Sequence, residues 1–239
     1  MIRYRLPAIC FAVALLCSPE SARTGEPKEI RLEFATVSGV SASAAVGESG
    51  DVYVGEVQGR LLALDPDTGT ATWQTEAIGR VVAAPAVGVD GTIYIPSDDG
   101  RLRAYVVGET RRWQSAILSA GLSVPAIGAD GSLYVGSEGG FLHGLGTDGA
   151  VQWTYTAGAA LTPPAVGTDG TVYAGGADGR LHAVEQHGES QWTYRAEGPI
   201  SAPLAIGADG TIYAGDETGR LHAVTPDGDA RWIFSADAP

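Results

Sequence analysis

Three histidines stand at one equivalent position of a repeated segment, where they could be taken for metal ligands. His143, His182 and His222 each end a run of the form Phe/Arg-Leu-His. Zinc requires each of its ligands within ~2 Å of the ion. If the repeated segments form successive sheets, equivalent strands lie on the order of 20 Å apart, given facing sheets ~10 Å apart and strands ~4.8 Å apart. We therefore predict no metal site, and we interpret the three histidines as partly exposed residues that pack between repeated units.

Four Asp-Gly pairs recur with the same period and could be taken for calcium loops. They begin at Asp90, Asp130, Asp169 and Asp209. A calcium loop supplies several spaced oxygen ligands, whereas each of these pairs offers one carboxylate. Tight hairpin turns need residues that tolerate positive φ, and Asp-Gly supplies them. The pairs therefore predict structural hairpins.

A third recurring group has charged side chains in a Gly-rich turn. An arginine follows this turn in four units, and Phe141 takes its place in the remaining unit, where Glu138 precedes it. Such charges can form surface ion pairs worth under ~1 kcal/mol each, or a mixed-charge rim that steers a protein partner. We predict partner binding here, with an asymmetric docking site near Glu138 and Phe141. The candidate residues are Arg60, Asp98, Arg101, Glu138, Phe141, Arg180 and Arg220.

An internal repeat predicts the strands that carry these residues. Tyrosines recur at 53, 94, 134, 173 and 213, and tryptophans at 73, 113, 153, 192 and 232, so the period is close to 40 residues. Each unit contains four short β-rich runs separated by turns, without a 3.6-residue apolar period. Four strands at this period are typical of a propeller blade. The sequence predicts an all-β propeller of about five four-stranded blades.

Residues 63–73, ALDPDTGTATW, match the pattern A-x-D-x-x-T-G-x-x-x-W. This pattern resembles the tryptophan-docking motif of the PQQ-like, quinoprotein-type propeller repeats. The other units keep its glycine and tryptophan in a shorter turn. The resemblance implies that the tryptophans are structural and dock between blades, at Trp73, Trp113, Trp153, Trp192 and Trp232.

The family resembled includes quinone-dependent dehydrogenases, so an enzyme must be considered. Those enzymes are eight-unit rings with a quinone, a metal, a catalytic aspartate and commonly an adjacent cysteine pair. This chain has five units and no adjacent cysteines, and its expected inner strands carry small uncharged residues such as Pro85 and Ala86. We predict no enzymatic activity, no cofactor and no catalytic residue.

The domain organisation expected is a leader followed by one propeller. Residues 1–22 have the positive start and short apolar run of a secretory signal peptide, and lipid anchoring through Cys17 is an alternative. A linker follows at 23–28 and the propeller at 29–239. Residues 30–35 predict an extra N-terminal outer strand that helps to close the ring. The blades are expected at about 41–76, 81–116, 121–156, 160–195 and 199–236.

The net charge of −13 bears on the partner. An acidic surface repels phosphate backbones, which argues against nucleic acid, and no transmembrane span is expected. The chain is also similar to the propeller lipoprotein of the outer-membrane β-barrel assembly machinery, a relative with more blades. We therefore expect a periplasmic or secreted, non-catalytic scaffold that binds another envelope or extracellular protein. A monomer is favoured over a dimer formed through an unpaired edge strand. The alternatives are a carbohydrate-binding or other small-ligand propeller and a truncated, inactive quinoprotein relative.

Overall fold

The structure is a computed structural model that describes residues 34, 36, 38–40, 42–76 and 78–236. The expected signal peptide and linker lie outside the described residues. Of the expected N-terminal strand, only Phe34 is described. No helix in the described part of the chain is long and apolar enough to cross a membrane.

The described residues form five four-stranded antiparallel sheets, each built from four consecutive strands. This confirms the all-β, five-unit prediction. We call the sheets blades 1 to 5 in chain order. Their strands are β1 Ala45–Val46, β2 Val52–Gly55, β3 Leu61–Leu64 and β4 Ala71–Gln74; β5 Ala86–Val87, β6 Ile93–Pro96, β7 Leu102–Tyr105 and β8 Trp113–Gln114; β9 Ala126–Ile127, β10 Leu133–Gly136, β11 Phe141–Leu145 and β12 Val151–Thr156; β13 Ala165–Val166, β14 Val172–Gly175, β15 Arg180–Val184 and β16 Ser190–Arg195; β17 Ala205–Ile206, β18 Ile212–Gly215, β19 Arg220–Val224 and β20 Ala230–Ser235.

The Asp-Gly pairs form the hairpins between the first and second strands. In blade 4, Asp169 Oδ1 accepts the backbone N–H of Thr171 at 3.0 Å, and Oδ2 accepts its hydroxyl at 2.9 Å. Gly170 has a φ of 87°, a conformation that only glycine adopts at little cost. The carboxylate therefore serves the turn, as the structural interpretation of these pairs predicts.

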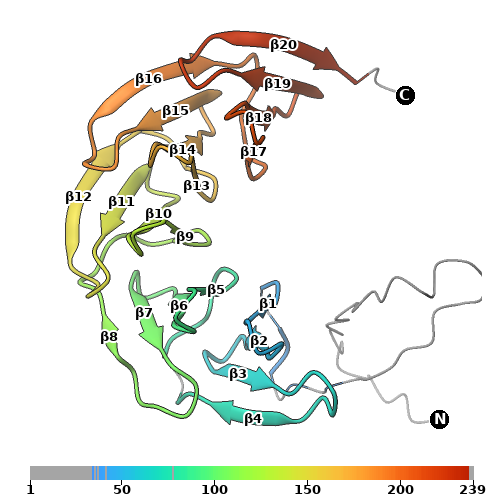
Figure 1. Cartoon of the computed structure of the whole chain (residues 1–239), viewed down its shortest axis with the longest axis vertical. Helices are drawn as coiled ribbons and strands as arrows, with labels where there is room; N and C mark the ends of the chain where they lie inside the picture. The colour runs from blue at the N-terminus through green and yellow to red at the C-terminus, as the bar shows by residue number, and fades with distance from the viewer. Residues whose placement is uncertain (1–33, 35, 37, 41, 77, 237–239) are drawn as a thin grey trace, which may run out of the picture.

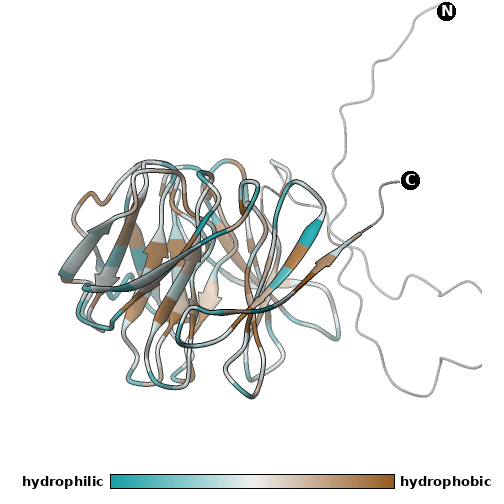
Figure 2. Cartoon of the chain, turned by 90° about the horizontal axis from the view of Figure 1, so that it is seen from above, coloured by the Kyte–Doolittle hydropathy of each residue, from teal (hydrophilic) through white to brown (hydrophobic). Residues whose placement is uncertain are grey.

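The apolar core lies in layers between neighbouring blades. Between blades 4 and 5, for example, Tyr173 and Leu181 pack with Ile212 and Val224. Apolar residues are concentrated along the strands, whereas polar residues gather toward the turns (Figure 2). Each blade is therefore stabilised mainly by its neighbours.

The five blades form an open arc, with the two-residue first strands toward its concave side (Figure 1). Blades 1 and 5 lie at the two ends of the arc, and β20 pairs only with β19 among the described strands. The expected closed ring is therefore not observed. The physical reason is that the side chains packed between two neighbouring sheets set the angle between those sheets. At this angle, five blades turn through only part of a circle.

Candidate protein-binding face

One edge of the arc, which we call the link face, contains the turns between the second and third strands and the connections between blades. Backbone hydrogen bonds join each of these turns to the connection before its own blade. The N–H of Asp98 donates to the carbonyl of Arg80 at 2.9 Å, and the N–H of Glu138 donates to that of Gly121 at 3.0 Å. The candidate binding residues from all five turns therefore lie along the same edge.

The arginines of four turns pair with nearby carboxylates, and that of blade 2, Arg101, lies 3.9 Å from Asp99. In blade 1, Arg60 lies 2.7 Å from Glu56, whose side chain is fully buried. In blade 4, Arg180 lies 2.6 Å from Asp178. In blade 5, Arg220 pairs with Glu197 of the preceding connection. These contacts agree with local ion pairing and hold each guanidinium in one place on the link face.

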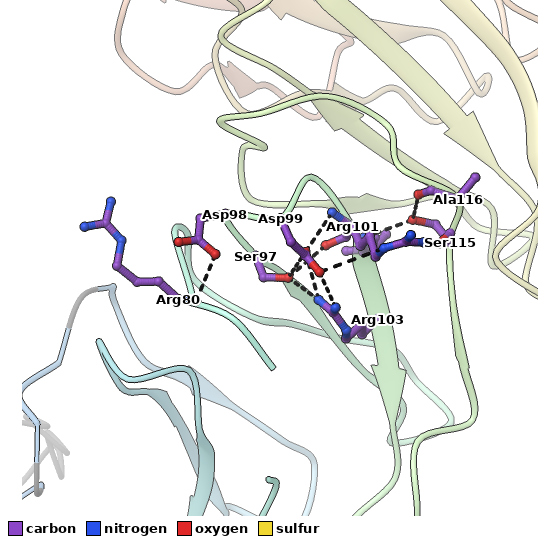
Figure 3. A network of polar contacts seen from close by, with 9 residues as sticks. Arg80, Ser97, Asp98, Asp99, Arg101, Arg103, Ser115 and Ala116 are labelled. Atoms are coloured by element: carbon purple, nitrogen blue, oxygen red, sulfur yellow. Dashed lines mark hydrogen bonds and ion pairs between the residues drawn. The ribbon is translucent and has the colours of Figure 1, made fainter. Parts of the chain in front are cut away.

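Blade 2 contains a denser network (Figure 3). Asp99 binds the guanidinium of Arg103, with NH1 3.0 Å from Oδ1. Arg101 donates to the carbonyl of Ser115 at 2.8 Å, and Asp98 accepts the backbone N–H of Arg80 at 3.0 Å. Burial alone would raise the pKa of Asp99, but hydrogen bonds led by that from Arg103 outweigh it and lower the pKa. Arg103 of β7 is buried in this network and is not among the candidate residues predicted from the sequence.

Blade 3 presents a different surface. Phe141 is half-buried and stacks on His143, with ring centroids 6.1 Å apart. Glu138 is exposed and forms no ion pair in the described part of the chain. This turn therefore offers an aromatic ring and an unpaired carboxylate where the other blades offer a paired arginine.

The repeated histidines bind residues of the preceding blade or connection. His182 Nδ1 lies 3.1 Å from the hydroxyl of Tyr155, and His222 Nδ1 lies 3.0 Å from that of Tyr194. His143 Nε2 lies 2.9 Å from Ser119 Oγ. The packing role predicted for them is correct, but the expected partial exposure is wrong. All three are at most 5% exposed because the preceding blade covers this side of the strand.

Burial changes the acid–base behaviour of two of these histidines. It lowers the pKa of His143 and of His182 below the ordinary value of 6.5, since a desolvated imidazolium is disfavoured. Across the residues that the structure describes, no group of three or more His, Cys, Asp or Glu side chains is arranged to hold a metal ion.

Three tryptophans reach across to the next blade. The indole N–H of Trp113 donates to the carbonyl of Thr147, that of Trp153 to Gln186, and that of Trp192 to Pro226, at 2.7–2.8 Å. Trp73 packs edge-on against Tyr105 of blade 2. Trp232 of blade 5 is 43% exposed. The first four tryptophans therefore make contacts between neighbouring blades.

Comparison with known proteins places this arrangement in a family. The sequence matches the family described as outer membrane protein assembly factor BamB over residues 21–112 and 107–239. No protein among curated sequences is a significant match.

Solved structures share the fold. One is BamB from Moraxella catarrhalis, with 17% identity and a TM-score of 0.60 over 87% of this chain and 80% of that one. Another is the computationally designed Ika8 protein, with 15% identity and a TM-score of 0.74 over 84% of this chain and 63% of that one. The match to the family over nearly all of the described residues carries the assignment: the chain belongs to the family of the outer membrane protein assembly factor BamB.

Proposed function

We propose that this protein is a non-catalytic scaffold that is exported to the cell envelope and binds another protein there during outer-membrane protein assembly. The family to which the chain belongs is described by that assembly role. The short apolar run within residues 1–22 supports export, since it has the length of a signal peptide rather than of a membrane span. The inner strands of the arc support a non-catalytic role, since they carry alanine, valine and isoleucine.

The observation that carries the proposed binding site is the asymmetry of the link face. Arg60, Arg180 and Arg220 are held in local ion pairs. Between them, blade 3 presents Phe141 and the unpaired Glu138. An aromatic ring on the same face as paired charges of both signs is typical of a protein interface, in which the ring contributes affinity and the charges set orientation. The partner expected is a protein with an apolar pocket for Phe141 and a basic side chain opposite Glu138.

Photo-crosslinking in the native envelope tests this assignment. A photoreactive residue at Phe141 should form one dominant crosslinked product with another envelope protein. The matched control places the same residue at Val89, which is 92% exposed on the opposite edge of the arc. Crosslinking at Val89 with none at Phe141 would mean that the partner binds elsewhere.

A further inference from the structure

Blade 5 exposes the side that every other blade buries. We call this side the trailing face and define it by Leu221, Trp232 and Phe234. These residues are 38%, 43% and 61% exposed. In blade 4, the equivalent Leu181 is fully buried, and the equivalent Trp192 packs against blade 5. The trailing face therefore has the composition of a blade interface but no blade against it among the described residues.

Trp232 also lacks the contact that the inner tryptophans make. In three inner interfaces, the indole N–H donates to a carbonyl in the turn between the third and fourth strands of the next blade. The indole also packs against a glycine of that turn. An added Cβ would lie 2.8 Å from Trp153 at Gly188 and 2.8 Å from Trp192 at Gly228. In the described structure, Trp232 contacts the ring of Tyr213 and donates no hydrogen bond.

Blade 1 has the reciprocal feature, a receiving turn without a tryptophan. Residues 65–69 form the complete version of this turn, in which Asp65 Oδ1 accepts the backbone N–H groups of Asp67 and Thr68 at 2.8 and 2.9 Å. Pro66 lies two residues after β3, as Gln186 and Pro226 lie two residues after β15 and β19. Its carbonyl accepts no hydrogen bond from the described residues. In the sequence, Leu32 stands where a preceding tryptophan would stand.

The side chains at the exposed end of blade 5 and at the receiving end of blade 1 also match, since both are apolar. Inner interfaces pair Tyr155 with His182 and Tyr194 with His222. At the ends, Phe234 occupies the tyrosine position and Leu62 occupies the histidine position. A Tyr or His at only one end would bury a polar group without a partner, which costs about 1–3 kcal/mol. Phenylalanine against leucine avoids that cost.

We propose that the trailing face of blade 5 docks onto blade 1 of a second copy of this chain, head to tail. Trp232 donates its N–H to the carbonyl of Pro66, and Phe234 packs against Leu62. In the single chain Leu62 is only 3% exposed, because Phe34 and Val40 pack against its cluster, so Phe234 must displace Phe34. The net gain comes from burying Trp232 and Leu221. The partner is a second copy because the two faces lie at opposite ends of one open arc (Figure 1). Such a heterologous contact leads to a ring of copies or to a chain of them.

Sedimentation of the purified exported protein tests this proposal. Its mass should rise with concentration, and more strongly at high salt, because two acidic copies repel each other; the full sequence has a net charge of −13. Phe234→Asp should weaken the association at least tenfold, as expected when an interface aromatic is lost. The matched control is Ile233→Thr, because Ile233 is 48% exposed on the opposite side of β20, where it lies across from His222. A monomer at every concentration would overturn the proposal.

A mixing experiment separates docking between copies from closure within one chain. Asp65→Ala should inactivate the receiving turn, and Phe234→Asp the trailing face, so that neither variant associates alone. An equimolar mixture retains one intact pair of faces and should form a one-to-one dimer. This recovery would also show that both variants fold. Failure of the mixture to associate would overturn the proposal, and so would a crosslink between residues 66 and 232 that forms only within one chain. Phe141→Ala should leave the mass unchanged, since the link face is a separate surface.

Discussion

The hydroxyl of Tyr194 in β16 lies 3.0 Å from Nδ1 of His222 in β19, and this hydrogen bond joins blade 4 to blade 5. The other ring nitrogen of His222 lies 3.0 Å from Asp216 Oδ2. The imidazole is therefore fixed at both nitrogens in a layer where it is 1% exposed. Contacts of this kind couple each blade to its neighbour.

Tyr194→Phe should lower the free energy of unfolding by about 1–3 kcal/mol, because it leaves Nδ1 of His222 buried without a partner. Urea unfolding of the monomer measures this change. The matched control is Phe234→Tyr, which adds the same hydroxyl at the equivalent but exposed position of blade 5 and should leave the stability of the monomer unchanged. Equal effects of the two variants would contradict the assigned role of Tyr194.

Gly188→Ala should destabilise the protein through two effects. Gly188 has a φ of 92°, and an added Cβ would lie 2.8 Å from the indole of Trp153. The left-handed conformation alone costs an alanine roughly 1–2 kcal/mol.

Gly158→Ala isolates the contact with Trp153, since Gly158 has a φ of 87° but has nothing within 4 Å of an added Cβ. Thermal unfolding should therefore show a larger loss for Gly188→Ala than for Gly158→Ala. Equal losses would mean that the indole does not dock against Gly188.

Stability should fall as the pH drops from 7.5 to 5.5. Burial lowers the pKa values of His143 and His182 in the folded state. The unfolded chain therefore binds more protons below its ordinary histidine pKa of 6.5, and protonation favours unfolding. Unfolding measured across this range checks the direction. His143→Leu with His182→Leu should flatten the profile, since leucine occupies this position in blade 1 as Leu62. An unchanged slope in the double variant would contradict this origin.

A second loss of stability is expected in acid. The hydrogen bond from Arg231 is the main cause that lowers the pKa of Asp209 to about 2. A carboxylate with a lowered pKa stabilises the fold above its unfolded pKa, and this contribution disappears as the pH falls from about 4 toward 2. Asp209→Asn should remove that part of the acid transition. Asp67→Asn is the control and should leave the transition in place, since Asp67 lies in an exposed turn and forms no ion pair with an arginine among the described residues.

The repeat predicts the fold well because the signals for its strands and turns lie within each unit of the sequence. Asp-Gly turns, Gly-rich turns and a tryptophan every 40 residues specify four strands per unit without knowledge of the neighbours. The shape of the arc was not predictable in this way. Five units can be counted from the sequence, but the angle between two sheets depends on how side chains such as Leu181 and Ile212 fill the layer between them.

The candidate site was predictable in part. Successive strands of a blade are antiparallel, so equivalent turns of all units lie at the same edge of the arc. This places Arg101, Arg180 and Phe141 on the link face. The burial of Arg103 and of the three histidines was not predictable, since it depends on which side of the strand the preceding blade covers. The sequence did contain a hint at Arg103, which occupies the position that histidine holds in blades 3, 4 and 5.

The central claim is that the link face binds another envelope protein. The most direct test measures how much of that partner is captured by a double variant, in which one charge is reversed and one side chain is shortened. The variant is Arg101→Glu with Phe141→Ala on the link face. The control makes the same two kinds of change on the opposite edge, as Arg111→Glu with Val89→Ala, both at exposed residues. Tagged proteins are isolated from the native envelope, and captured partner is quantified for variants with unchanged circular dichroism. We predict that the link-face variant captures at least tenfold less partner than the unmodified protein and that the control captures as much as the unmodified protein. Full capture by the link-face variant, with loss in the control, would contradict the account.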